Sequence, residues 1–292
     1  MELARTGVWS SIDDLSSNDA VAFAKRIEAL GYSALWLPEA VGRDPFVLAA
    51  QLLDHTSRLV VATGVANIYA RDPMAMKAAQ HTLAEQSGGR FLLGIGVSHQ
   101  LLVEEWRGHQ YGPPLASMRR YLDRFDQCEY GGRSPAENPP LVLAALGPKM
   151  LELARERADG AHPYMVTPEH TRRAREILGP DRLLCTEQKL LHESDADKAR
   201  AIARRSPAIS MGLSLPNYRR SLTRQGFEDA DFEGGFSDRL VDAVVASGDI
   251  VALAGRVQAH YDAGATHVCI HIVPTPDSSG PDWRLLEALA PG

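Results

Sequence analysis

Apolar runs rich in β-branched residues recur along the chain and are separated by more polar stretches. Eight of these runs predict strands: TGVWS, SALWLP, LVVATGVANIY, RFLLGIGV, LVLAAL, AHPYMV, RLLCTEQKLL and THVCIHIV. They are nearly continuous in apolar character rather than alternating, which is expected when both faces of a sheet are covered. The pattern therefore favours a parallel sheet.

Amphipathic helical segments lie between most of these strands, and three of them begin in the same way. Asp44-Pro45, Asp72-Pro73 and Thr167-Pro168 each supply a capping side chain followed by proline at the first helical position. The stretches EALGYSALWL, ERADGAHPYM and YDAGATHVCI each predict a helix, a glycine C-cap and then a strand. This repeated unit predicts an α/β fold, a (β/α)8 TIM barrel, with a doubly wound open sheet as the alternative.

One stretch exceeds the usual barrel pattern. Residues 206–249 lie between the seventh predicted strand and the last helix, and they hold several short helical patterns with too much apolar content for a disordered segment. We expect one TIM-barrel domain over residues 1–292, with 206–249 as an inserted lid region that passes over one barrel face. Tyr218, Arg219 and Phe227 would belong to that lid.

Composition narrows the class of protein. The 292 residues carry a net charge of −6, which gives no support to nucleic-acid binding. No apolar run approaches the ~20 residues of a membrane helix, and we expect no secretory signal. Cys128, Cys185 and Cys269 lie far apart without C-x-x-C spacing, which predicts free thiols in a reducing cytosol and no metal site.

In a TIM barrel the active site forms at the carboxyl ends of the strands. Polar or small residues follow the apolar runs at most of these ends: Trp9, Ser10, Pro38, Glu39, Gly64 to Asn67, Val97 to His99, Leu146 to Lys149, His162, Glu187, Lys189 and His271. Lys189 shares its strand with Glu187, which would keep it protonated, so a Schiff-base lysine is not expected. The first strand lacks the paired histidines of a metal-dependent hydrolase.

Several of these residues allow two interpretations. Glu39 is placed for a general base or a substrate anchor, or for a loop ion pair with Arg43. His99 could pass protons near pH 7, or it could cap a neighbouring helix. His162 and His271 could face a substrate or be core histidines, and Asn67 could contact a bound ring or satisfy its own loop.

Two glycine-containing stretches are candidates for anion binding. ALGPKM places Gly147 and Pro148 at a strand-to-helix junction, where free N–H groups and Lys149 would attract a phosphate; the alternative is a plain turn. LGIGVS at residues 93–98 looks like part of a dinucleotide fingerprint but lacks the third glycine and the immediate helix.

Taken together, the strand ends resemble those of the bacterial luciferase-like flavin and deazaflavin oxidoreductases, most closely the branch that depends on the deazaflavin coenzyme F420. The likeness rests on an ordered set of stretches that runs almost end to end: GYSALWLPEAVGRDPF, LVVATGVANIYARDPMAMKAAQHTLAEQSGGRFLLGIGVSH, PLVLAALGPKMLELARERADGAHPYMVTPEHT, GGFSDRLVDAVVASGD and VQAHYDAGATHVCIHI.

This resemblance implies a cis peptide bond between Gly64 and Val65, which would press on one face of the cofactor ring. Val65 would be the apolar support of the ring, followed by Ala66, and Asn67 would reach the ring or the ribityl edge. By the same likeness, Ala145-Leu146-Gly147-Pro148 would take the cofactor phosphate, with Lys149 adjacent. Arg43, Arg71 and Lys149 could meet its acidic tail.

The chain departs from the deazaflavin-dependent sugar-phosphate dehydrogenases of this family at two positions. Those enzymes carry an acid followed by histidine after the second strand, where this chain has Glu39-Ala40. They carry a glutamate proton donor after the fourth strand, at about the position of His99. The resemblance therefore makes His99 and Glu39 the acid–base candidates without implying a sugar-phosphate substrate.

We expect a cytoplasmic oxidoreductase that transfers a hydride between coenzyme F420 and a small organic substrate. Trp9, His162 and Tyr218 are the expected substrate-binding residues. The alternatives are a two-component monooxygenase that uses reduced FMN and a non-catalytic flavin or deazaflavin carrier. We expect a homodimer and no nucleic-acid or membrane partner.

Overall fold

The computed structural model describes residues 3–275 and 280–291, and its centre is a closed barrel of parallel strands. The strands are β1 (Thr6–Trp9), β2 (Ala34–Leu37), β3 (Val60–Thr63), β4 (Ala66–Asn67), β5 (Phe91–Gly96), β6 (Leu141–Leu143), β7 (Gly160–Ala161), β8 (Leu183–His192), β9 (Val245–Gly248) and β10 (His267–Ile272). All eight predicted runs contribute a barrel strand, with β3 and β4 both arising from the third run. The TIM-barrel prediction is confirmed.

The barrel closes because β10 pairs in parallel with both β1 and β8. Around the ring the order is β10, β1, β2, β3, β5, β6, β7 and β8, while β4 continues beyond β3 and pairs with β5. The additional strand β9 was not predicted from the sequence. It pairs with the last four residues of β8, beyond the part of β8 that contacts β7.

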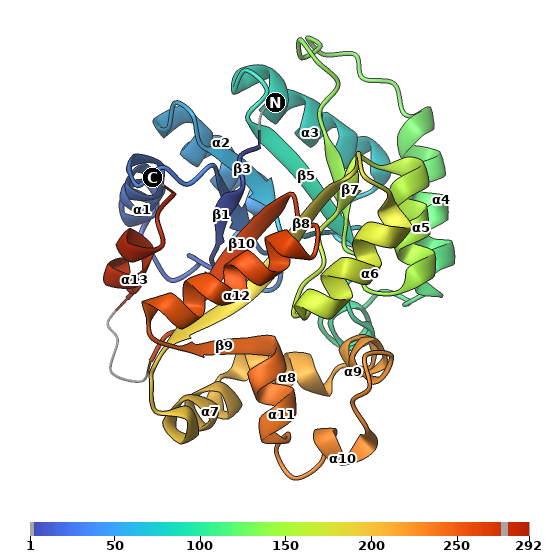
Figure 1. Ribbon diagram of the computed structural model, residues 1–292. Helices are drawn as coiled ribbons and strands as arrows, with labels where there is room; N and C mark the ends of the chain where they lie inside the picture. The colour runs from blue at the N-terminus through green and yellow to red at the C-terminus, as the bar shows by residue number, and fades with distance from the viewer. Residues whose placement is uncertain (1–2, 276–279, 292) are drawn as a thin grey trace.

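Helices cover the outside of the barrel and its carboxyl-end rim (Figure 1). They are α1 (Ser17–Ala29), α2 (Pro45–His55), α3 (Pro73–Gln86), η1 (Leu102–Trp106), α4 (Pro114–Gln127), α5 (Pro148–Arg157), α6 (Pro168–Leu178), α7 (Ala196–Arg205), α8 (Pro207–Ser214), α9 (Pro216–Thr223), α10 (Asp229–Phe232), α11 (Asp238–Val244), α12 (Ile250–Asp262) and α13 (Trp283–Ala288). The predicted caps are confirmed, since the side chains of Asp44, Asp72 and Thr167 each accept a hydrogen bond from the first turn.

One predicted helix end is wrong. Gly31 and Gly264 have positive φ angles of 87° and 99°, as expected of glycines that end helices. Gly160, by contrast, lies inside β7, three residues past the end of α5 at Arg157. A Cβ at Gly160 would lie 2.0 Å from the carbonyl oxygen of Leu183, so this glycine allows β7 to approach β8.

The excess segment forms short helices at the carboxyl end of the barrel. Residues 206–249 contain α8 to α11 and β9, and α7 packs against α8 and α11 as part of the same group. Figure 1 shows these helices gathered along the lower side of the view, while α12 returns across β8 and β10. They have an apolar cluster of their own, into which Met165 from the rim of the barrel also packs.

The barrel wall and its surroundings bury three histidines in the neutral form. His162 and His267 lie on the inner side of the barrel and His260 lies on α12, and all three are at most 1% exposed. Burial lowers the pKa of His162 and His267 to about 4 and that of His260 to about 3. His267 is also hydrogen-bonded on both nitrogens, to the indole N–H of Trp36 and the carbonyl of Ala4.

These histidines make stability depend on pH. Above about pH 6.5 they are neutral in both states, whereas below it the unfolded chain binds protons that the folded chain does not bind until about pH 4. We predict that the free energy of unfolding falls between pH 6.5 and pH 5, by up to about 1.4 kcal/mol per pH unit for each histidine. Urea denaturation at several pH values measures this slope. His267→Gln should make the slope shallower, and an unchanged slope would contradict the assignment.

Candidate active site at the barrel rim

The peptide bond between Gly64 and Val65, at the end of β3, is cis, as the family resemblance implied. The indole Nε1 of Trp9 donates a hydrogen bond of 2.8 Å to the carbonyl oxygen of Gly64. A Cβ at Gly64 would lie 2.9 Å from that nitrogen and 3.2 Å from Nε2 of His162. Position 64 therefore has no room for a side chain while Trp9 holds the carbonyl.

The neighbouring strand is shaped to receive Val65. A Cβ at Gly96 would lie 2.7 Å from Cγ2 of Val65, and one at Gly94 would lie 2.2 Å from the carbonyl oxygen of Thr63. The hydroxyl of Thr63 donates to the carbonyl of Gly94 and accepts from its N–H. The glycines of LGIGVS thus allow β3 and β4 to lie close to β5, and no dinucleotide fingerprint is involved.

Glu39 holds this segment from the other side. Its Oε2 accepts the backbone N–H of Asn67 at 2.7 Å, and its Oε1 accepts from the guanidinium of Arg71, which also contacts Asp44. The side chain of Glu39 is only 7% exposed. Both carboxylate oxygens of Glu39 are therefore hydrogen-bonded within the protein. Glu39 was predicted as an acid–base group, but this geometry suits a residue that positions the backbone of Asn67.

Two sequence-based alternatives at this end of the barrel can now be decided. The ion pair between Glu39 and Arg43 is wrong, because Arg43 instead donates to the backbone carbonyl of Leu15. Asn67 is 3% exposed, and its Oδ1 accepts the backbone N–H of Tyr69 at 2.9 Å. The amide of Asn67 therefore satisfies its own loop, as one of the two interpretations had it.

His99 lies where the inserted helices meet the rim. Burial lowers its pKa, and a hydrogen bond with the side chain of Asn217 opposes that shift. Its ring lies 5.8 Å from that of Tyr218, which in turn lies 6.2 Å from Tyr164. Tyr218 is 9% exposed, so α9 covers this part of the barrel mouth.

His162 lies beneath the rim and has the environment of a core histidine. It is stacked on Trp36 at 4.4 Å, and its Nδ1 lies 2.7 Å from the carbonyl oxygen of Cys185. Its Nε2 is buried without a hydrogen-bond partner, on the side where Gly64 lies. The geometry places His162 below the Gly64 peptide, so it supports that segment from underneath.

A charged cluster lies near the middle of β8 and the carboxyl end of β10. Glu187 Oε1 accepts from Nζ of Lys189 at 2.7 Å and lies 2.8 Å from Nδ1 of His271, while Oε2 accepts the backbone N–H of Met165. The ammonium of Lys189 also lies over the ring of Tyr164. Burial acts to raise the pKa of Glu187, but Lys189 and His271 outweigh burial and hold it at about 2, so the carboxylate is charged. The interaction of Glu187 with Lys189 was expected from the sequence, whereas the contacts of Glu187 with His271 and with the backbone of Met165 were not.

The start of α5 is open to an anion. Its N-cap residue, Gly147, has no capping side chain, in contrast to the starts of α2, α3 and α6. A Cβ at Gly147 would lie 3.4 Å from Nη1 of Arg224, an exposed residue that follows α9. Nε2 of His170 lies 2.9 Å from the carbonyl oxygen of Leu146 and fixes the loop. No sequence signal indicated Arg224, because it reaches α5 only through the folding of the insertion.

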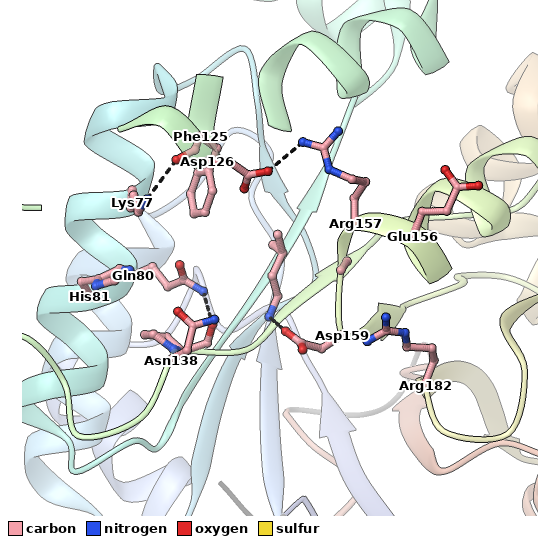
Figure 2. Close-up of a pocket in the computed structure, with 13 residues that line it drawn as sticks. Lys77, Gln80, His81, Phe125, Asp126, Asn138, Glu156, Arg157, Asp159 and Arg182 are labelled. Atoms are coloured by element: carbon pink, nitrogen blue, oxygen red, sulfur yellow. Dashed lines mark hydrogen bonds and ion pairs between the residues drawn. The ribbon is translucent and has the colours of Figure 1, made fainter. Parts of the chain in front are cut away.

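A pocket of about 420 Å³ lies at the opposite end of the barrel (Figure 2). Its residues include the start of β6 at Leu141 and residues just before β7 and β8, Asp159 and Arg182. Figure 2 shows polar side chains here bonded within the protein, as Arg157 is to Asp126. This pocket is structural and separate from the rim.

No helix within 3–275 and 280–291 is long and apolar enough to cross a bilayer. In the same residues, no group of three or more histidine, cysteine, aspartate or glutamate side chains is arranged to bind a metal ion.

Comparison with known proteins identifies the family. The model of the luciferase-like monooxygenase family matches residues 3–179, and the chain belongs to this family. A Mycobacterium tuberculosis protein named as a coenzyme F420-dependent oxidoreductase is 27% identical, over 90% of this chain and 92% of its own length.

Solved structures share the fold. One is an F420-dependent secondary alcohol dehydrogenase in complex with an F420-acetone adduct, with a TM-score of 0.75 and 13% identity over 99% of this chain and 97% of its own. Another is the FMN-bound oxygenating constituent of 3,6-diketocamphane monooxygenase from Pseudomonas putida, with a TM-score of 0.72 and 14% identity over 99% and 97%.

The cluster around Glu187 generates a prediction about stability. Glu187→Ala leaves the buried ammonium of Lys189 without its counter-charge, which typically costs about 3–5 kcal/mol of unfolding free energy. Chemical denaturation measures this loss. Adding Lys189→Met to Glu187→Ala should recover part of it, and Glu176→Ala, at an exposed position of α6, should change little. Equal losses for the single and the double variant would show that the charge pair is not the cause.

Proposed function

We propose that this chain is an oxidoreductase that transfers a hydride between coenzyme F420 and a small organic substrate. The observation that carries the proposal is the presence, on one rim, of the apolar side chain of Val65 after β3 and of the start of α5, which no side chain caps. The F420-dependent name of a relative that covers nine-tenths of the chain supports the choice of deazaflavin.

The residues at the rim fit such a cofactor. Gly147 leaves the first N–H groups of α5 accessible, and the guanidinium of Arg224 lies beside them. The segment Ala145–Lys149 would hold the phosphate and Gly64–Asn67 would support the ring. When bound, the deazaflavin accepts or donates a hydride.

The remaining rim residues would prepare the site for that chemistry. Trp9 fixes the carbonyl of Gly64, so the ring support is rigid before any ligand arrives. Tyr218 of α9 would face the substrate and exclude water, which is the role of a lid. His99 stays a predicted proton-transfer residue. Glu39, whose oxygens are engaged by Asn67 and Arg71, would act mainly by holding the ring support.

A monooxygenase that uses reduced FMN is the second candidate. The FMN-bound structural neighbour supports it, because the same barrel rim accommodates that flavin there. The two cofactors share a ribityl phosphate, so the anion site would serve both. Their relative affinity for this chain separates the two functions.

The cofactor proposal predicts which ligand binds and which contact matters. Titration of the purified protein with F420 or FMN, followed by quenching of ring fluorescence, should give the tighter binding for F420. Arg224→Ala should weaken F420 binding about tenfold because a charge-assisted hydrogen bond is lost, and should leave binding of the phosphate-free deazaflavin unchanged.

The control is Arg205→Ala, which removes an exposed arginine at the end of α7, just before the insertion, and should not affect either ligand. Micromolar FMN binding with no F420 binding would favour the monooxygenase. No affinity for either ring would refute the proposed function altogether.

We also propose that the chain forms a homodimer through exposed apolar side chains near the starts of α2 and α3 and on η1. Val41, Val47, Met74, Leu101 and Trp106 are each 47–73% exposed. The loop before α2 is joined to the end of η1, since the guanidinium of Arg107 donates to the carbonyl of Ala40, and α2 packs against α3. A cytosolic location stays a prediction, consistent with the three free cysteines.

A charge in this surface should separate the subunits. Light scattering should give the mass of a dimer for the unmodified protein and of a monomer for Val47→Asp combined with Trp106→Glu. Val251→Asp, at a 79% exposed position on α12, is the matched control and should remain dimeric. A monomer before any substitution would contradict the proposal.

A further inference from the structure

The cluster of Glu187, Lys189 and His271 has no part in the cofactor contacts proposed above. His271 and Lys189 are register partners on β10 and β8, and Cys269 pairs with Glu187 two residues earlier. Side chains at alternate positions of a strand share a face. The three ionisable side chains therefore lie together on the inner side of the barrel, near the middle of β8 and the carboxyl end of β10.

His271 is the member of the cluster that reaches the rim. Glu187 and Lys189 have no exposed side-chain surface, whereas the side chain of His271 is 15% exposed. Its ring lies 4.3 Å from that of Trp9, whose Nε1 donates to the carbonyl of Gly64. One side chain thus separates His271 from the proposed ring support.

The hydrogen bond with Glu187 sets the tautomer of His271. The charged carboxylate is only an acceptor, so Nδ1 of the neutral imidazole carries the proton and Nε2 carries the lone pair. Within residues 3–275 and 280–291, the hydrogen bonds of His271 all involve Nδ1. Nε2 is therefore available as a base, and Glu187 is placed to stabilise the imidazolium that forms when Nε2 is protonated.

We propose that His271 is the catalytic base and acid of this site and that the substrate is a small alcohol or the matching carbonyl compound; this rests on the proposed function. Nε2 would take the hydroxyl proton, and a bound oxidised deazaflavin would supply the acceptor for the hydride of the carbinol carbon. The balance would leave the carbonyl compound, with the proton held on an imidazolium paired with Glu187 and the hydride on the deazaflavin. In the reverse direction the imidazolium returns its proton to the carbonyl oxygen. Glu187 is a positioning residue.

The groups that face His271 define its expected titration. Lys189 and Glu187 face it from β8, Tyr164 from the segment after β7 and Trp9 from β1. Burial lowers the pKa of His271, Lys189 adds to that shift, and Glu187 opposes it. Because alcohol oxidation requires the neutral imidazole, its rate should rise with pH through this pKa and then level off.

The first experiment examines the protein without cofactor. In ¹⁵N-labelled protein, the histidine signals that are absent from His271→Asn belong to His271. They should show the Nδ1–H tautomer at pH 7.5, and Glu187→Gln should lower the pKa further. The paired variant Glu187→Gln/Lys189→Met serves if the single variant does not fold. An Nε2–H tautomer, or a pKa unaffected by loss of the carboxylate, would overturn the inference.

The second experiment measures transfer. Single-turnover reduction of F420 by a panel of three- to six-carbon secondary alcohols should be at least about a hundredfold slower in His271→Asn. The pH dependence should disappear, while F420 quenching stays unchanged. His99→Asn is the competing variant: if it removes the pH dependence and His271→Asn does not, the proton passes through His99 and the inference is wrong.

The outcomes also separate this inference from the function on which it rests. If F420 binds but no alcohol reduces it and no matching ketone oxidises the reduced form, the role of His271 is overturned while hydride transfer to another substrate class survives. If F420 does not bind to the unmodified protein, the proposed function itself fails.

Discussion

The hydrogen bond from the indole of Trp9 to the carbonyl of Gly64 is the constraint on which the rim depends. It connects the ends of β1 and β3, and it leaves no space for a side chain at position 64. The backbone that follows then directs Val65 toward the glycines of β5 and brings the N–H of Asn67 to Glu39. This one buried hydrogen bond thus helps to fix the orientation of the segment from Gly64 to Asn67. The glycines of β5 and the carboxylate of Glu39 contact the same segment from other sides.

The fold could be predicted from the sequence because its signals are local and repeated. Nearly continuous apolar strands, capping residues such as Asp44 and Asp72, and glycines at helix ends all lie within a few residues of what they determine. Gly160 shows the limit of this reasoning. A glycine after a helix is usually a cap, but here its lack of a side chain serves contact with Leu183, a residue of the next strand.

The site was predicted less completely for a physical reason. The residues at strand ends could be named, since the TIM barrel fixes where those ends lie, but their partners could not. Glu39 binds Arg71 rather than Arg43, and Glu187 gathers donors from three separate segments. Side-chain pairing across a barrel depends on strand register and tilt, which an apolar pattern does not encode. Arg224 was missed for another reason, since it reaches Gly147 at the start of α5 only through the folding of the insertion.

Helix α9 and the residue after it contact the rim at two distant places. Asn217 and Tyr218 lie at His99, while Arg224 lies beside Gly147 at the start of α5. A ligand that shifts one end of this short helix also shifts the side chains at its other end. For the proposed phosphate site at α5 and the proposed substrate site at His99, thermodynamic linkage would require reciprocity: the factor by which bound phosphate raised the affinity for substrate would equal the factor by which bound substrate raised the affinity for phosphate. The insertion would in this way make the binding of the cofactor phosphate and the binding of substrate cooperative within a single subunit.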